Sequence, residues 1–103
     1  MPAINLRDHP KLRGKWPPDW HPNNPIASHN KTGPQGEQGT LKEVRRYWHG
    51  SSGHLALIVR YEGESYHGQV ELEDEFFCQN LLNALATCIG RSIQDIGNIN
   101  LAF

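Results

Sequence analysis

Residues 54–72 read HLALIVRYEGESYHGQVEL, and this stretch decides the fold. Apolar side chains alternate on both sides of its central Glu-Gly-Glu, which is typical of two half-buried strands joined by a tight turn. A two-residue loop at Gly63-Glu64, with glycine first as a type II′ turn prefers, places Leu57 opposite Val70. Apolar positions then meet apolar positions or glycine, so we expect an antiparallel hairpin. Its predicted strands are residues 54–62 and 65–72.

A further strand is predicted before this hairpin, over residues 40–48. A loop around residues 50–53 joins it to the next strand and places Val44 opposite Val59. The same register puts Glu43 opposite Arg60, where the two side chains would form a cross-strand ion pair.

A helix follows the hairpin, because Asp74 is a natural N-cap and Gly90 is a typical helix end. The apolar residues between them recur every three or four positions, which indicates a helix over residues 75–89 with one buried face. Ser92 then caps a single turn, and residues 99–103 alternate like a short final strand. The predicted fold is α+β, a small mainly antiparallel sheet in the order β-β-β-α-β with one helix on one face. The helical stripe comprises Phe77, Cys78, Leu81, Leu82, Leu85, Cys88 and Ile89.

The N-terminal third has a different character, because all seven prolines lie between Pro2 and Pro34. Proline interrupts every candidate helix or strand there. We therefore divide the chain into an irregular arm, residues 1–38, and a compact domain, residues 39–103. The arm holds nine apolar residues and the domain 29, so the core must come mostly from the domain. A domain of that size is marginal, and we expect the arm to dock on it.

The charge pattern limits the classes of partner. The net charge is −1, but residues 1–61 are basic and residues 62–103 are acidic. Strong attraction to nucleic acid or membranes usually needs a larger one-sided field. No apolar run is long enough to span a membrane, and no secretory signal is visible. Cys78 and Cys88 would lie roughly 15 Å apart on one helix, too far for a disulfide, which favours a cytoplasmic location.

The sheet face away from the helix is the predicted binding surface. It is apolar at its centre and polar around it, as binding surfaces often are. The favoured interpretation, however, is that the arm lies across this face, with Trp16, Trp20 or Ile26 covering Tyr47, Ala56 and Ile58, because a core of 65 residues is small. The candidate binding residues are Arg45, Tyr47, His49, His54, Arg60 and His67, together with Trp16 and Trp20 from the arm.

Six histidines raise the question of a metal site. Only His49 and His54 have a geometric argument, because the predicted register makes them face each other. They could share a zinc ion with His67 or Glu71 nearby. No established metal motif supports such a site, and no nucleophile, phosphate loop or orienting carboxylate indicates catalysis. We therefore expect no cofactor and no enzymatic activity.

Several motifs along the chain resemble a small uncharacterised bacterial protein family with an N-terminal Trp-Pro-Pro-x-Trp arm. The resemblance implies a bacterial, intracellular accessory protein and carries no activity or site residue. Its motifs are Trp16-Pro17-Pro18-Asp19-Trp20, residues 36–44, Tyr66-His67-Gly68, Phe77-Cys78, Gly90-Arg91-Ser92-Ile93 and residues 96–101.

The leading functional prediction is a non-catalytic protein–protein interaction or adaptor module with a protein partner not identified by the sequence. The arm supports it, because two tryptophans beside two stiff prolines form a segment that must dock somewhere. The alternative is a single-stranded nucleic-acid-binding protein, since basic and aromatic residues are interleaved in the first 61 residues. A metal- or histidine-dependent enzyme comes third, and self-association through a strand edge is open. The basic set is Lys11, Arg13, Lys15, Lys42, Arg45, Arg46 and Arg60.

Overall fold

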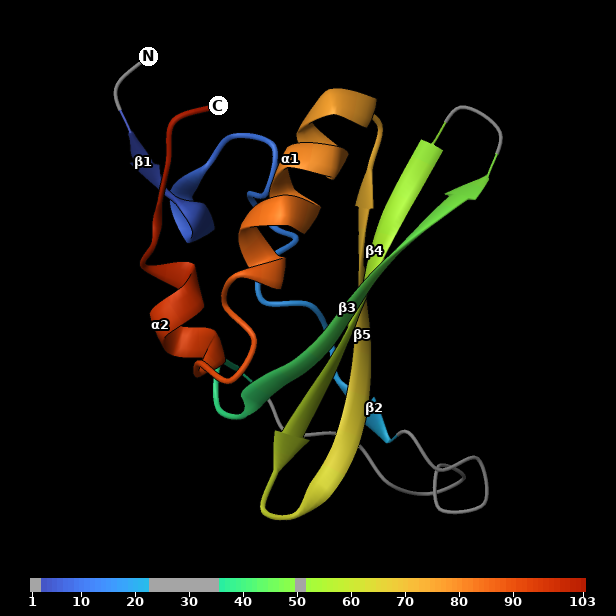
Figure 1. Ribbon diagram of the computed structural model, residues 1–103, viewed down its shortest axis with the longest axis vertical. Coiled ribbons are helices and arrows are strands. Elements are labelled where there is room, and N and C mark those ends of the chain that lie inside the picture. Colours follow the sequence, from blue (N-terminus) through green and yellow to red (C-terminus); the bar gives the residue numbers. More distant parts are fainter. Residues whose placement is uncertain (1–2, 23–35, 50–51) are drawn as a thin grey trace.

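A four-stranded antiparallel sheet forms one side of the molecule (Figure 1). The structure is a computed structural model that describes residues 3–22, 36–49 and 52–103. Within these ranges one main helix packs on the sheet, so the predicted α+β fold is confirmed. In sheet order the strands are β2 (His21–Pro22), β5 (Glu64–Leu72), β4 (Ser52–Tyr61) and β3 (Thr40–His49).

The central hairpin of β4 and β5 has a different register from the predicted one. Leu57 lies opposite Gly68, not opposite Val70, because the turn is Glu62-Gly63 rather than Gly63-Glu64. Both turn residues have positive φ, 50° and 81°, which is the requirement of a type I′ turn. The pairing therefore shifts by two residues. A shift of two keeps every side chain on its predicted face, so the alternation could not exclude it.

The pairing of β3 with β4 also differs from the prediction. Val44 lies opposite Leu57, and Arg60 lies opposite Thr40, with a bulge between Leu41 and Glu43. The predicted Glu43–Arg60 ion pair is therefore wrong, and Glu43 instead pairs with Arg45 on its own strand. A bulge adds one unpaired residue, here Lys42, and periodicity alone gives no signal for it.

Helix α1 (Glu75–Ala86) begins as the sequence predicts. The Asp74 side chain accepts a hydrogen bond from the backbone N–H of Phe77 at 3.0 Å. The helix ends earlier than predicted, with Thr87 as its C-cap, and Ile89 is therefore 45 % exposed rather than part of the buried stripe. In the described part of the chain, no helix is long and apolar enough to cross a membrane.

The C-terminal segment packs with the start of the arm. Helix α2 (Ile93–Gly97) is capped by Ser92, as predicted. The final strand, β6 (Asn100–Leu101), does not join the main sheet but pairs with β1 (Ile4–Asn5) in a second, two-stranded sheet. A single 3-10 turn, η1 (Leu6–Asp8), follows β1.

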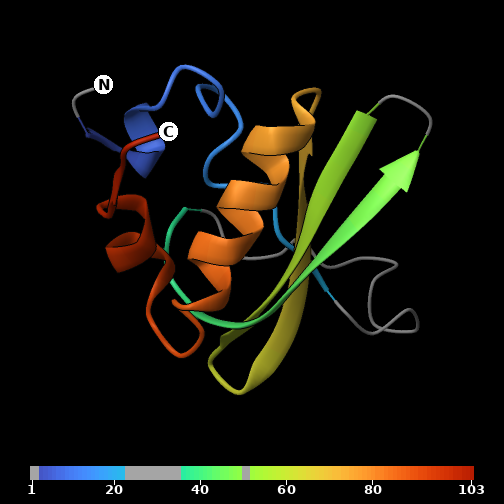
Figure 2. The same cartoon turned by 45° about the horizontal axis from the view of Figure 1, so that its top comes forward.

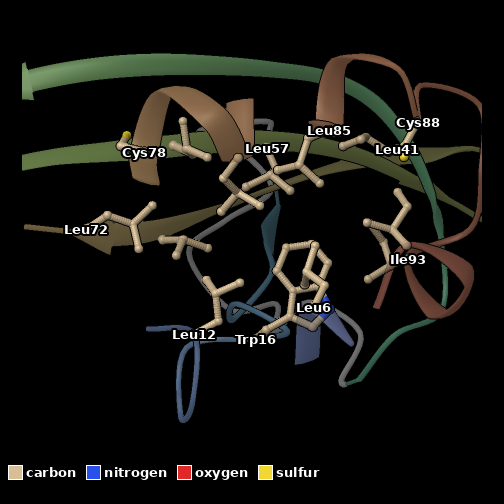
Figure 3. Packing of buried hydrophobic residues seen from close by; sticks show 14 of the residues in the cluster. Leu6, Leu12, Trp16, Leu41, Leu57, Leu72, Cys78, Leu85, Cys88 and Ile93 are labelled. Atoms are coloured by element: carbon tan, nitrogen blue, oxygen red, sulfur yellow. The ribbon is translucent and has the colours of Figure 1, made fainter. Parts of the chain in front are cut away.

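The arm packs on the same side of the sheet as α1 (Figure 1 and Figure 2). Figure 3 shows Leu6, Leu12 and Trp16 turned toward side chains of the sheet and the helices. These three residues and Trp20 are buried in the single core cluster. The favoured prediction that Trp16 or Trp20 covers the opposite face of the sheet is therefore wrong, and Ile26 lies outside the described residues.

Candidate functional site

The sheet face turned away from α1 carries the candidate site, and we call it the outer face. Side chains alternate along each strand, so the paired registers bring one set of residues from three strands onto this face. The helix and the buried residues of the arm pack on the opposite side. The outer face comprises Glu43, Arg45 and Tyr47 from β3, His54, Ala56, Ile58 and Arg60 from β4, and His67, Gln69 and Glu71 from β5.

Five of the predicted binding residues are thus brought to one surface, while two are not. Arg45 and Arg60 are exposed on this face, and Tyr47 is 42 % exposed. His54 and His67 are half-buried beside them. The arm tryptophans are part of the core, with 8 % of Trp16 and 2 % of Trp20 exposed. The side chain of the eighth residue, His49, lies outside the described part of the chain.

An aromatic pair lies on the outer face where β3 ends and β4 begins. Tyr47 lies directly opposite His54 in the β3–β4 register. Their rings are stacked, with centroids 5.5 Å apart and planes inclined by 29°. Such a pair offers a flat, amphipathic contact surface at little cost in side-chain entropy.

A hollow lies beside this aromatic pair on the outer face and is lined in part by Tyr47 itself. Its volume is about 300 Å³, and Ala56 and Ile58 contribute its apolar part. Glu43 and Arg45 form an ion pair at its rim, and Tyr47 completes the lining. The hydrogen bond to the Glu43 carboxylate, followed by the contact with Tyr47, raises the pKa of Arg45 above its ordinary value. The lining of the hollow therefore combines apolar side chains with an ion pair.

The predicted His49–His54 metal pair is not supported by the strand register. His49 pairs with Ser52 and His54 with Tyr47, because the hairpin is shifted by two residues. Among the described residues, no group of three or more His, Cys, Asp or Glu side chains could hold a metal ion.

A different pair of histidines does meet. His21 of β2 lies directly opposite His67 of β5, and their ring centroids are 5.7 Å apart. Sequence reasoning missed this pair, because a two-residue strand ending in Pro22 leaves no periodic signal. A hollow of about 300 Å³ borders the pair and is lined by Asp19, His21, His67, Gly68 and Gln69.

Part of the predicted basic surface is used to hold the arm in place. Lys11 forms an ion pair with Asp74, and Lys15 Nζ donates a hydrogen bond to the Glu71 carbonyl oxygen at 2.8 Å. The Asp74 pKa is lowered, first by the hydrogen bond from Lys11 and then by that from the Phe77 N–H. Fewer cations are therefore left to attract a polyanion than the sequence alone indicates.

Neither cysteine has the environment of a reactive thiol. Cys78 and Cys88 are free and buried, 0 % and 3 % exposed. Burial raises the pKa of Cys78, which keeps its thiol protonated.

The chain matches no protein-family model, no curated protein and no solved structure. The resemblance to a small bacterial protein family therefore stays a prediction.

Proposed function

We propose that this protein is a non-catalytic protein–protein interaction module that binds its partner through the outer face. The observation that most directly supports this proposal is the hollow of about 300 Å³ beside the stacked Tyr47 and His54 rings. Protein interfaces combine an apolar centre with a polar rim, and tyrosine and arginine are enriched among their energetically dominant residues. Ala56 and Ile58 supply such a centre, with Arg45 at its edge.

The free side of β3 supports the same proposal. The start of this strand is occupied, since the Leu41 N–H donates to the Arg91 carbonyl oxygen at 3.0 Å. Beyond the bulge, no described strand pairs with β3 on the side away from β4. An extended segment of a partner could add there as a further strand, and a second copy of this chain could do so as well.

Affinity capture with matched variants tests this proposal. Tyr47→Ala and Ile58→Glu alter the outer face, whereas Phe76→Ala changes a residue that is 82 % exposed on α1. Wild type and Phe76→Ala should capture the same protein from a lysate of the source organism, and the two face variants should lose it. Equal capture by all forms, or capture of nothing, would contradict the proposal. Light scattering of the purified protein separates self-association from a foreign partner.

Single-stranded nucleic acid is the second candidate ligand, and the stacked Tyr47–His54 pair favours it. Bases stack on aromatic rings, and Arg45 and Arg60 on the same face could contact phosphates. Glu43 and Glu71 lie on that face too and oppose a polyanion. Fluorescence anisotropy with labelled oligo-dT and oligo-U should show binding that weakens with salt and with Tyr47→Ala. No binding at low salt would exclude this candidate.

A further inference from the structure

We propose that His21 and His67 form a binding site for a divalent transition-metal ion, which ties the arm to the edge of the sheet. The two residues are direct neighbours in the antiparallel pairing of β2 with β5. Their ring centroids are 5.7 Å apart and their planes are inclined by 38°. His67 belongs to the outer face, but neither histidine lines the hollow that carries the proposed function, so the metal site can be tested separately from it.

The spacing of the rings suits a shared ion. A zinc–nitrogen bond is about 2.0 Å, which places each ring centroid roughly 3.2 Å from the metal. For a bond angle of about 110 to 130°, the two centroids then stand roughly 5.2 to 5.8 Å apart. The observed 5.7 Å falls in this interval without a change in the backbone.

The surroundings of the pair leave room for an ion and its remaining ligands. The bordering hollow has a volume of about 300 Å³, and the polar residues Asp19 and Gln69 are part of its lining. Nδ1 of His67 is buried and has no hydrogen-bond partner among the described residues. An unpartnered buried ring nitrogen is a group that a bound ion would satisfy.

The number of protein ligands indicates an exchangeable ion rather than a structural one. No described group of three or more His, Cys, Asp or Glu side chains could hold a metal, so water must complete the coordination. Two imidazoles with open positions suit Zn²⁺, Ni²⁺ and Cu²⁺, whereas Mg²⁺ and Ca²⁺ prefer oxygen ligands.

The position of His21 and His67 in the fold determines what a bound ion would do to the protein. β2 has only two residues, and it is the described part of the arm that joins the main sheet. An ion bound to both His21 and His67 would hold this short strand on β5. Because that geometry exists in the folded chain only, binding multiplies the ratio of folded to unfolded chains by one plus the free metal concentration divided by the dissociation constant.

Urea denaturation with and without Zn²⁺ or Ni²⁺ tests the site. At a free Zn²⁺ concentration ten times the dissociation constant, the ratio of folded to unfolded chains should rise about tenfold. His21→Ala and His67→Ala should each abolish that rise. His54→Ala is the matched control, since His54 stacks on Tyr47 elsewhere on the outer face and should leave the rise unchanged. Mg²⁺ should have no effect on any form.

A spectroscopic readout covers the case in which a variant is too unstable to compare. In the wild-type protein, Zn²⁺ should shift the imidazole NMR signals of His21 and His67 with one-to-one stoichiometry. The imidazole signals of His54 should not shift. The proposal is overturned if Zn²⁺ shifts neither histidine of the pair, if stabilisation persists in His21→Ala or His67→Ala, or if His54→Ala loses it equally.

Discussion

Trp20 lies so close to Gly68 that a Cβ atom at Gly68 would stand 2.7 Å from Cε3 of the indole ring. The indole N–H donates to the Gly36 carbonyl oxygen at 2.9 Å, so the ring is fixed on two sides. Gly68 is opposite the fully buried Leu57, which places this contact on the helix side of the sheet. The arm is therefore held against β5 by a close approach that only glycine permits.

Substituting Gly68 should therefore be costly. Gly68→Ala forces the indole ring away, and overpacking of this kind costs about 1–3 kcal/mol of unfolding free energy. Urea denaturation measures the loss. Gln69→Ala is the control, because the neighbouring side chain is exposed on the outer face.

A double-mutant cycle identifies the cause of that loss. In a Trp20→Ala background, the added methyl of Gly68→Ala no longer meets the indole ring and keeps the contact with the Asp19 carbonyl oxygen at 3.0 Å, so most of its penalty should disappear. If Gly68→Ala costs the same in both backgrounds, the strand geometry and not the indole contact explains the glycine.

The turn of the central hairpin gives a second prediction. Glu62 has a φ of 50°, which lies in the left-handed region. This conformation costs most residues about 1 kcal/mol, whereas glycine and asparagine adopt it more readily. Glu62→Asn creates the favoured Asn-Gly type I′ turn and should raise the free energy of unfolding by about 1 kcal/mol. Gly63→Ala should lower it, since Gly63 has a φ of 81°. A turn at Gly63-Glu64 would instead make Glu62→Asn neutral or unfavourable.

The sequence could predict the faces of the strands but not their register. Leu55, Leu57 and Val59 are all fully buried, as their alternation indicates. A shift of two residues preserves that alternation, so turn chemistry had to choose between registers. Glutamate is uncommon at positive φ, and the glycine-first loop was therefore the natural but wrong prediction.

The candidate site was predictable only in part, for a related reason. Arg45, Tyr47 and Arg60 follow from the strand alternation and do lie exposed on the outer face. The arm has no period, so nothing in the sequence says on which side of the sheet Trp20 docks. The partner of His67 comes from the same arm, which is why the His21–His67 pair was not foreseen.

The interactions of the Asp74 carboxylate should make the free energy of unfolding depend on pH. Its pKa is lowered in the folded protein, mainly by Lys11 and then by the Phe77 N–H. Its contribution to stability is therefore complete above the ordinary carboxyl pKa of about 4. That contribution falls as the pH drops through the lowered folded value, because the unfolded chain then binds the proton more readily.

Two substitutions at this position separate the cap from the charge. Asn caps a helix about as well as Asp, so Asp74→Asn should keep the cap but flatten the acid side of the stability profile. Asp74→Ala should lower the urea midpoint at every pH. An acid limb that is unchanged in Asp74→Asn would show that other carboxyl groups cause it.

The two buried thiols give a prediction about local opening of the fold. Burial raises the pKa of Cys78, and Cys88 is only 3 % exposed, so neither should react with a thiol reagent such as DTNB in the native state. Both should react in urea. Phe76→Cys places a thiol at a position that is 82 % exposed and should react at once, which controls for the reagent.

Labelling of the native thiols requires opening of the core, so destabilisation by Gly68→Ala should accelerate it in proportion to the rise in the open population. Rapid labelling of the stable wild-type protein would instead mean that α1 leaves the sheet in a local motion, without unfolding of the arm contact.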